Sequence, residues 1–183
     1  MTVTALDHTA ALIVIDLQAG TLGAPTAHPA DDIVARANDL LGAFRAQGLP
    51  VVLANVDGTP AGRTQYGEGA REFPGAFSAL VPGLDQQPSD LTITRATWSA
   101  FAGTDLHALL TERGITQLVL AGIATSFGVE STARDAYDLG YSVAIAVDAI
   151  TDRSAEAHEK SVAGVFPALG QTGTTAEIIA LLA

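Results

Sequence analysis

Three chemically distinctive positions follow segments that have the character of buried strands. Asp16 closes the apolar run ALIVID, Arg95 closes LTITR, and Gly128 lies in the turn after QLVLAGI. Uninterrupted apolar runs are typical of parallel sheets, and α/β proteins bind ligands beyond the carboxyl ends of such strands. There a carboxylate can transfer a proton, and a guanidinium can hold an anion. We therefore expect Asp16, Arg95 and Gly128 to converge on one site.

The segments around these positions alternate between strand and helix patterns. Residues 31–48 repeat apolar side chains at helical spacing, open with acids and stop at a glycine, so they should cross the sheet between two strands. The expected strands are 11–16, 50–56, 91–95, 117–123 and 141–147 with a short edge element in 170–179, and the further helices are 104–114 with Thr104 as N-cap, 129–140 and 151–170. This alternation predicts a three-layer, doubly wound α/β fold, Rossmann-like, with a mainly parallel sheet.

The chain between Asp57 and Ser89 does not follow this alternation. It contains many glycines and prolines, as in DGTPAGRTQYGEGAREFPG, and has little periodicity. It therefore reads as a long surface excursion, and long loops of compact domains often act as lids.

Composition limits the class of protein. A chain of 183 residues without a linker-like segment predicts a single domain over residues 1–183. No apolar run approaches the roughly 18 residues that span a membrane, and no secretory signal is visible, so we expect a soluble cytoplasmic protein. The net charge of -11, with no cluster of basic residues, argues against nucleic acid as a partner.

Cysteine and histidine usage limits the chemistry. The chain has no cysteine, which excludes disulfides, thiolate nucleophiles and cysteine-based metal sites. Its four histidines show no paired ligand spacing, and for each we expect a surface or capping position: His8, His28, His107 and His158. We expect neither a metal site nor a cofactor.

The turn and the helix after it carry a family resemblance. The segment GIATSFGVESTARDA resembles the isochorismatase-like hydrolases, whose pattern runs Gly-x-x-Thr-x-x-Cys-Val-x-x-Thr-Ala-Arg-Asp-Ala. The matching residues are Gly122, Thr125, Val129, Thr132, Ala133, Arg134, Asp135 and Ala136. The segments ALIVIDLQ, RATWSAFAGTDL, GYSVAIAVDAITD and FPALGQTGTTAEII also resemble family segments in the family's order, so the likeness covers nearly the whole chain.

The resemblance implies a catalytic set in which two of three members have changed. The Asp-Lys-Cys set of the family's amidases falls on Asp16, Arg95 and Gly128. A glycine cannot attack a substrate, so the protein is not expected to be a Cys-dependent amidase. The segment NVDGTP also lacks the Asp-x-His sequence with which nicotinamidases of this family bind metal.

The family's isochorismatases proper suggest a chemistry that needs no covalent intermediate. Some of them resemble this chain in carrying glycine or serine at the cysteine position, and they cleave a vinyl ether to release pyruvate. By that likeness Asp16 is the candidate acid, with a pKa raised by burial. Arg95 leaves two alternatives: it pairs with Asp16 and lowers the pKa of that carboxyl, or it turns toward a substrate carboxylate.

The residues around the turn are candidates for substrate contact. The expected substrate-binding residues are Gln18, Trp98, Phe101, Thr125, Ser126, Phe127 and Gly128, where Gly128 would make room and its turn would offer backbone N–H groups to an anion. The alternative for Trp98 and Phe101 is a place in the core, where such aromatic residues more often lie. Ser126 is a weak candidate nucleophile, because no motif places a histidine beside it. Family members have a non-proline cis peptide in this turn, which we expect at Ala124–Thr125.

Two hypotheses of different classes follow. The first is a hydrolase of a small anionic substrate that acts by acid/base chemistry, with Asp16 as the acid or base and Arg95 as an electrostatic anchor. The second is a catalytically retired family member that binds a metabolite or a protein partner in the inherited pocket. Family members are commonly dimers or tetramers, so the resemblance also implies a homo-oligomer.

Overall fold

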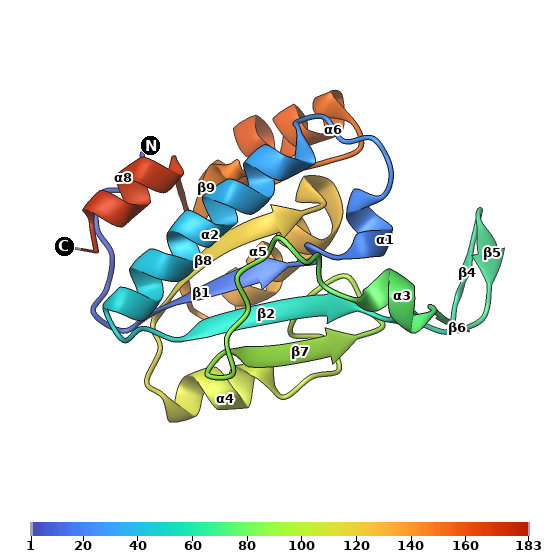
Figure 1. The fold of residues 1–183 in the computed structure, drawn as a ribbon, viewed down its shortest axis with the longest axis horizontal. Helices are drawn as coiled ribbons and strands as arrows, with labels where there is room; N and C mark the ends of the chain where they lie inside the picture. The colour runs from blue at the N-terminus through green and yellow to red at the C-terminus, as the bar shows by residue number, and fades with distance from the viewer. Residues whose placement is uncertain (1, 183) are drawn as a thin grey trace.

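The sheet of this protein has six strands, and all neighbouring pairs are parallel. The computed structural model describes residues 2–182. The strands lie in the order β10 (Gln171–Gly173), β9 (Ser142–Thr151), β8 (Gln117–Ile123), β1 (Ala10–Ile15), β2 (Val51–Val56) and β7 (Leu91–Arg95), as Figure 1 shows. The chain runs outward from β1 through β2 to β7 and then returns to the other side of β1. This is the predicted doubly wound sheet, and its switch point lies between β1 and β8.

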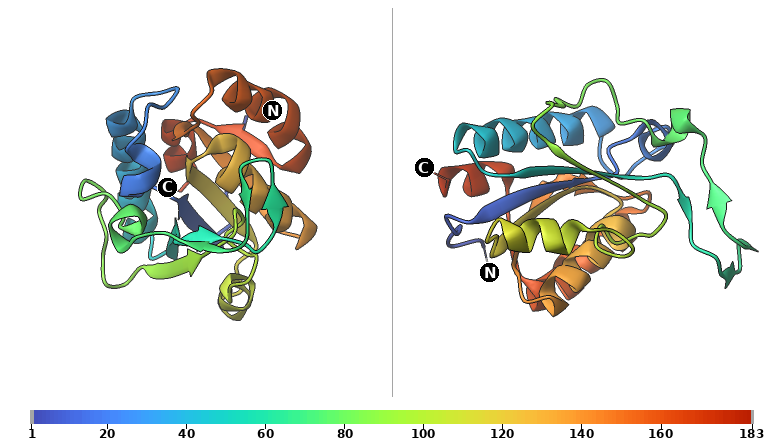
Figure 2. Two further views of the ribbon diagram at one scale, coloured as in Figure 1. Left: turned by 90° about the vertical axis from the view of Figure 1, so that its right-hand side faces the viewer. Right: turned by 90° about the horizontal axis from the view of Figure 1, so that it is seen from below.

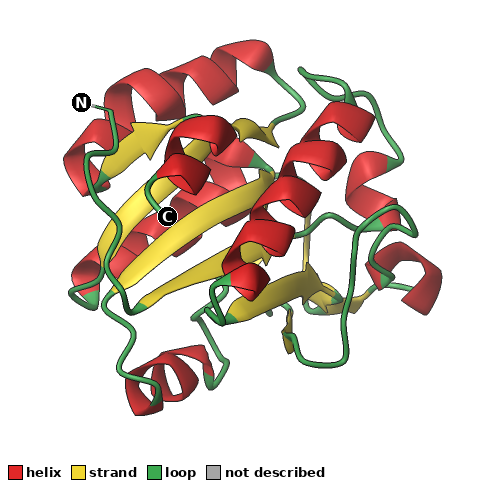
Figure 3. Ribbon diagram, turned by 60° about the vertical axis from the view of Figure 1, so that its left-hand side comes forward, coloured by secondary structure: helices red, strands yellow, loops and turns green. Residues whose placement is uncertain are grey.

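Helices cover both faces of the sheet. On one face α2 (Ala30–Ala46) and α8 (Thr175–Ala180) bury their apolar side chains, and on the other face α4 (Leu106–Glu112), α5 (Glu130–Asp138) and α7 (Phe166–Leu169) do so. Figure 2 shows the sheet edge-on between the two helical layers, and Figure 3 shows helices in front of and behind the strands. The predicted three-layer α/β architecture is therefore confirmed.

Strand β1 lies at the centre of the molecule because both of its faces are apolar. Ile13 and Ile15 belong to the core on the α4 and α5 side, whereas Leu12 and Val14 belong to the core under α2. Side chains alternate between the two faces of a strand, so an uninterrupted apolar run is what a doubly covered strand requires. This burial fixes the position of Asp16, the residue directly after β1.

Gly122 allows β8 to approach β1 closely at the carboxyl end. It pairs with Ile15 in the parallel ladder and has a φ of 121°, in the region that favours glycine. A Cβ atom at position 122 would collide with the backbone of Ile15. Only glycine therefore fits where the two strands that carry Asp16 and the Gly128 turn meet.

Several element boundaries differ from those expected. Helix α4 begins at Leu106, so Thr104 is not the N-cap, although its Oγ1 accepts a hydrogen bond from the Leu106 N–H. Strand β9 continues to Thr151, and the next helix, α6 (Ala155–Lys160), begins only after Ser154, whose side chain accepts from the Ala157 N–H. A π-helical turn (Ser161–Val165) joins α6 to α7.

The excursion after β2 forms a projecting arm. Residues 57–73, called the arm below, contain two pairs of two-residue strands: β3 (Gly58–Thr59) with β6 (Arg71–Glu72), and β4 (Arg63–Thr64) with β5 (Gly67–Glu68). Helix α3 (Gly75–Ser78) follows it. Every residue from 60 to 72 is exposed, and the arm points away from its own domain (Figure 1). The surface excursion that the sequence predicted after β2 is therefore observed in the arm.

Among residues 2–182, no helix is both long enough and apolar enough to cross a membrane.

Candidate functional site

Asp16 and Arg95 form a buried ion pair at the carboxyl edge of the sheet. Asp16 follows β1 and Arg95 ends β7, so the guanidinium reaches across β2 to the carboxylate. Its Nη1 donates to Oδ1 at 2.5 Å and its Nη2 donates to Oδ2 at 3.0 Å. The two residues are 6% and 4% exposed. Of the two alternatives for Arg95, the structure therefore has the one in which it pairs with Asp16.

Burial and the neighbouring Arg95 shift the pKa of the Asp16 carboxyl in opposite directions. Burial raises the pKa of its carboxyl above the ordinary value, while the hydrogen bonds and the charge of Arg95 oppose this rise. The rise due to burial is the larger influence, so the expectation that pairing leaves the Asp16 pKa lowered is corrected. Its backbone has a φ of 52°, a left-handed conformation that aspartate and asparagine tolerate better than most residues.

Gly128 lies directly beside this carboxyl group. It belongs to a π-helical turn (Thr125–Val129) between β8 and α5 and is buried. A Cβ atom at position 128 would lie 3.2 Å from Oδ2 of Asp16 and 3.0 Å from Cγ2 of Ile15. A side chain at position 128 would therefore crowd the carboxyl group, and glycine avoids this. Asp16, Arg95 and Gly128 converge as the sequence predicted.

The turn itself is held by the carboxylate of Asp152. The backbone N–H and the Oγ of Ser126 both donate to Asp152 Oδ2, at 2.7 and 2.8 Å, and the Phe127 N–H donates to the Ala124 carbonyl. These two amides of the turn are therefore occupied within the protein. The non-proline cis peptide of the turn is Ile123–Ala124, one bond earlier than expected.

His158, which we expected at the surface, is instead buried against the turn. His158, on α6, is buried, and its Nδ1 is 2.9 Å from the hydroxyl of the buried Thr125. Burial lowers the pKa of His158, the neighbouring His28 lowers it further, and Asp152 and Glu159 oppose this. Thr125 thus contacts this histidine rather than the open side of the site, and Ser126 contacts Asp152 rather than a histidine. No spacing pattern in the sequence brings residues 125 and 158 together.

Of the three aromatic residues predicted to contact substrate, Trp98 and Phe127 are exposed beside the site, whereas Phe101 is in the core. Trp98 is 61% exposed and Phe127 is 46% exposed, and their rings meet edge to face at 4.9 Å between centroids. The Trp98 carbonyl also accepts a hydrogen bond from Arg95 Nη2 at 2.9 Å. Phe101 is instead a core residue stacked on Tyr141, so its assignment to substrate binding is wrong.

Gln18 is fully buried and holds the site's framework together. Its Nε2 donates to the carbonyls of Val56 and Phe77, and its Oε1 accepts from the Val56 N–H. Both donors are thereby used, and the side chain ties the end of β1 to the end of β2 and to α3. We therefore correct its expected role from substrate contact to positioning.

Among the described residues, no group of three or more histidine, cysteine, aspartate or glutamate side chains is arranged to hold a metal ion.

Comparison with known proteins identifies the family. Residues 10–177 match the family model described as "Isochorismatase domain". The chain is 41% identical to the isochorismatase family protein YecD of Escherichia coli O157:H7, over 93% of this chain and 95% of that protein. It is 39% identical to the isochorismatase family protein YwoC of Bacillus subtilis (strain 168), over 92% of each chain.

A solved structure gives the same result. An isochorismatase family protein from Burkholderia thailandensis superposes with a TM-score of 0.92 and 40% identity, covering 97% of both chains. Similarity of this extent includes the sheet, both helical layers and the turn that carries Gly128. This chain, which has no cysteine and hence no cysteine nucleophile, belongs to the isochorismatase family.

Proposed function

We propose that this protein hydrolyses a small anionic metabolite without a covalent enzyme intermediate, and that Asp16 transfers the proton. The observation that carries this proposal is the buried carboxyl group of Asp16, which is bonded to Arg95 and has a residue without a side chain, Gly128, directly beside its Oδ2. The substrate class that best fits is a vinyl ether, because its hydrolysis needs a proton donor and no nucleophilic side chain.

In the proposed reaction, hydrolysis of the vinyl ether takes three steps: proton transfer, addition of water and collapse of the hemiketal. Asp16 delivers its proton to the methylene carbon of the enol ether, and an oxocarbenium-like species forms beside the new carboxylate. Water adds to the ether carbon and returns a proton to Asp16. The resulting hemiketal collapses to pyruvate and the alcohol, so that the enzyme ends in its starting state. Burial of Asp16 favours the protonated form that the first step requires.

Arg95 stabilises Asp16 in the step in which that residue is a charged carboxylate. Its two terminal nitrogens bond to both oxygens of Asp16, so the guanidinium stabilises the carboxylate that forms when the proton leaves. Its Nε–H is buried and has no acceptor among the described residues. An unpaired buried donor costs about 1–3 kcal/mol, so an oxygen atom of an anionic ligand at Nε would remove this cost.

The first experiment is to incubate the purified protein with isochorismate and to follow pyruvate with a coupled dehydrogenase. Asp16→Asn is the control, because asparagine accepts the left-handed backbone of this position and cannot transfer the proton; its melting temperature shows whether it stays folded without the charge that pairs with Arg95. Pyruvate release that disappears in Asp16→Asn supports the proposal. A panel of small esters and amides follows if isochorismate is not cleaved, and full activity of Asp16→Asn on any substrate would overturn the role of Asp16.

A second candidate function is binding without turnover. Two members of the family's catalytic set are replaced, and both oxygens of the remaining Asp16 are occupied by Arg95. A protein that only binds would show a ligand-dependent rise in melting temperature without product, because a ligand that binds the folded state stabilises it. Multiple turnovers with a physiological substrate would exclude this candidate.

A further inference from the structure

Two histidines from distant parts of the chain meet next to the turn that carries Gly128. His158, on α6, is buried and His28 is half-buried, and their ring centroids lie 4.6 Å apart with the ring planes at 67°. The other two histidines, His8 and His107, are exposed. Imidazole is the side chain whose charge ordinarily changes between about pH 5 and pH 8. A proton taken up by His28 or His158, called the histidine pair below, would therefore place a charge within the framework of the site.

Each ring of the histidine pair contacts the hydroxyl of a fully buried threonine. Nδ1 of His158 lies 2.9 Å from Oγ1 of Thr125, the first residue of the turn. Nδ1 of His28 lies 3.2 Å from Oγ1 of Thr151, the last residue of β9. Among residues 2–182, neither hydroxyl hydrogen has another acceptor. Buried polar groups in folded proteins are paired, so each Nδ1 is the acceptor and carries no proton.

Protonation of a ring removes this acceptor. A protonated imidazole donates from both nitrogens and accepts at neither. The hydroxyl hydrogen of Thr125 would then face an N–H group, and turning it away would leave a buried donor without a partner, which is unfavourable. A second proton on the neighbouring ring would add repulsion between two charges whose ring centroids are 4.6 Å apart. The neutral pair is therefore compatible with the observed turn, whereas the protonated pair is not.

The carboxylate that holds the turn cannot neutralise such a proton without releasing it. Burial and the neighbouring His28 lower the pKa of His158, and Asp152 and Glu159 oppose this. Oδ2 of Asp152 accepts from the N–H and the hydroxyl of Ser126, and its Oδ1 accepts from the N–H groups of residues 153 and 154. If Asp152 turned toward a protonated ring, it would give up Ser126. Protonation of the pair therefore loosens the turn by this route as well.

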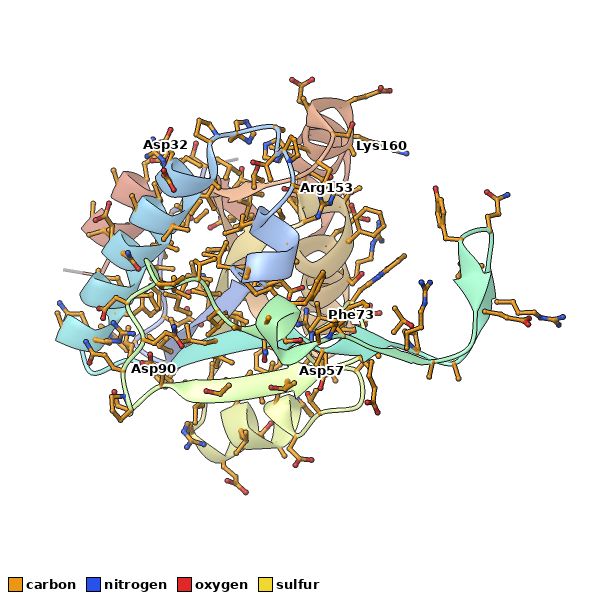
Figure 4. All side chains as sticks on the ribbon, turned by 45° about the vertical axis from the view of Figure 1, so that its right-hand side comes forward. Asp32, Asp57, Phe73, Asp90, Arg153 and Lys160 are labelled. Atoms are coloured by element: carbon orange, nitrogen blue, oxygen red, sulfur yellow. The ribbon has the colours of Figure 1, made fainter. Side chains whose placement is uncertain are left out.

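The remaining charged groups on the elements around the pair are paired elsewhere or exposed. Arg36 on α2 pairs with Asp148 in β9, and Glu130 on α5 pairs with Arg134. No ion pair within residues 2–182 involves either ring. The exposed groups, three of which are labelled in Figure 4, are Asp31, Asp32, Arg153, Glu156, Glu159 and Lys160.

We propose that the histidine pair makes the position of the turn depend on pH. The neutral pair holds Thr125 against α6. In mild acid one proton enters the pair, the contact with Thr125 breaks, and the turn shifts and carries Gly128 away from Asp16. This inference concerns the conformation of the turn and stands whether or not the protein catalyses the reaction proposed above.

Trp98 reports the position of the turn without an added label. It is the one tryptophan of the chain, and its ring meets that of Phe127, a residue of the turn, at 4.9 Å between centroids. The backbone of Trp98 is held separately, because its carbonyl accepts from Arg95. A shift of the turn therefore moves Phe127 relative to Trp98 and changes both the Trp98 emission and the near-ultraviolet circular dichroism.

The first measurement follows these two signals in the wild-type protein between about pH 8 and pH 5, with far-ultraviolet circular dichroism of the same samples as the test of folding. We expect a reversible change in the Trp98 signals with a midpoint below about pH 6.5, while the far-ultraviolet spectrum stays constant. Trp98 signals that stay constant, or that change only together with the far-ultraviolet spectrum, would overturn the proposal.

Two variants test the contact between His158 and the turn. His158→Asn still offers a polar atom to Thr125 but cannot take up the proton, so the transition should disappear. Thr125→Val keeps the histidine pair and removes the contact, so Trp98 should no longer follow the pH although the NMR signal of the His158 ring still titrates. Melting temperatures at pH 8 show whether each variant folds, and His158→Asn alone decides the matter if Thr125→Val does not.

The second histidine provides a test of direction. His28 lowers the pKa of His158, so His28→Asn should move the midpoint of the transition to higher pH. His8→Asn, at the exposed surface, is the matched control and should keep the wild-type midpoint.

Loss of the transition in His158→Asn together with its shift to higher pH in His28→Asn supports the proposal. A transition that survives in His158→Asn, or one that His8→Asn removes, would overturn it. Trp98 signals that still follow the pH in a folded Thr125→Val protein would also overturn it, because the proton would then act on the turn by another route.

Discussion

Gly128 faces the carboxyl group of Asp16 so closely that a Cβ atom at position 128 would lie 3.2 Å from Oδ2. The two residues follow different strands, β1 and β8, and they come this close because residue 128 has no side chain. In the family's amidases the cysteine occupies the corresponding position of the motif. Here the same position has no side chain, so adding one is the most direct perturbation of the site.

Filling this space with a methyl group should destabilise the protein and abolish any activity that depends on Asp16. Gly128→Ala should lower the free energy of unfolding by about 1–3 kcal/mol, because the new Cβ crowds Ile15 and Asp16 in a packed interior. Urea unfolding measures the loss. Gly42→Ala is the matched control: nothing lies within 4 Å of a Cβ in the interior of α2, so it should stabilise by about 0.5–1 kcal/mol. Equal stability of Gly128→Ala and wild type would contradict the crowding.

Removing the buried guanidinium of Arg95 should lower the free energy of unfolding far more than removing the exposed guanidinium of Arg134. Arg95→Met leaves the Asp16 carboxylate buried without its partner, so we expect a loss of about 3–5 kcal/mol in unfolding free energy. Arg134→Met breaks only an exposed pair with Glu130 and should cost at most about 1 kcal/mol. Denaturant midpoints of the two variants provide the comparison, and similar losses would mean that the buried pair is not structurally important.

Arg95 also predicts a change in the pH profile of any activity. Its charge and hydrogen bonds oppose the rise in the Asp16 pKa, so their removal should raise that pKa further. If Asp16 acts as an acid, the high-pH limb of kcat/KM should move to higher pH in Arg95→Met. A purely structural Arg95 would reduce the amplitude of the profile without moving this limb.

The buried histidine predicts a loss of stability in mild acid. The pKa of His158 is lowered in the folded protein, whereas it is about 6.5 in the unfolded chain, so below that pH the unfolded state binds the additional proton. The stability linked to His158 is therefore present above pH 6.5 or so and decreases as the pH falls. Melting temperatures between about pH 8 and pH 5 should decline more steeply for the wild type than for His158→Asn.

The histidine variant has its own control. Asparagine at 158 can still offer a polar atom to the Thr125 hydroxyl, and His8→Asn changes a histidine at the exposed surface. His8→Asn should keep the wild-type dependence on pH. A His158→Asn protein with the wild-type slope would show that other groups control acid stability.

Asp152 should prove to be the residue that fixes the turn. Its Oδ2 accepts from the Ser126 N–H and hydroxyl, and its Oδ1 accepts from the Arg153 N–H. Asp152→Ala removes these charge-assisted bonds, each worth about 1.5–3 kcal/mol, so we expect a loss of at least 2 kcal/mol or so in unfolding free energy. Ser126→Ala removes only the hydroxyl bond and should cost about 1.5–3 kcal/mol, less than Asp152→Ala, which removes the other bonds as well. Equal effects of the two variants would contradict this role.

The sequence was sufficient for the sheet and for the convergence of Asp16, Arg95 and Gly128, because both follow from local pattern. Apolar runs mark doubly covered strands, and the carboxyl ends of parallel strands share one edge. The family motif added the identity of the turn. These signals are contained in short segments and do not depend on how distant segments pack.

The contacts that depend on packing could not be predicted in this way. His158 reaches Thr125 across 33 positions of sequence, and Gln18 bonds to main-chain groups of Val56 and Phe77, which no spacing rule encodes. Phe101 and Trp98 are three residues apart, yet one is in the core and the other is exposed. The direction of the arm is likewise a property of the folded chain.

Gly122 sets the distance between the two segments that carry Asp16 and Gly128. Because it has no side chain, the backbone of β8 rests against Ile15, and this contact sets the separation between the chain that bears Asp16 and the turn that bears Gly128. A larger residue at position 122 would wedge these two segments apart without touching either side chain of the ion pair. The reach of the carboxyl group toward a substrate is thus governed by a glycine six residues upstream of the turn's own.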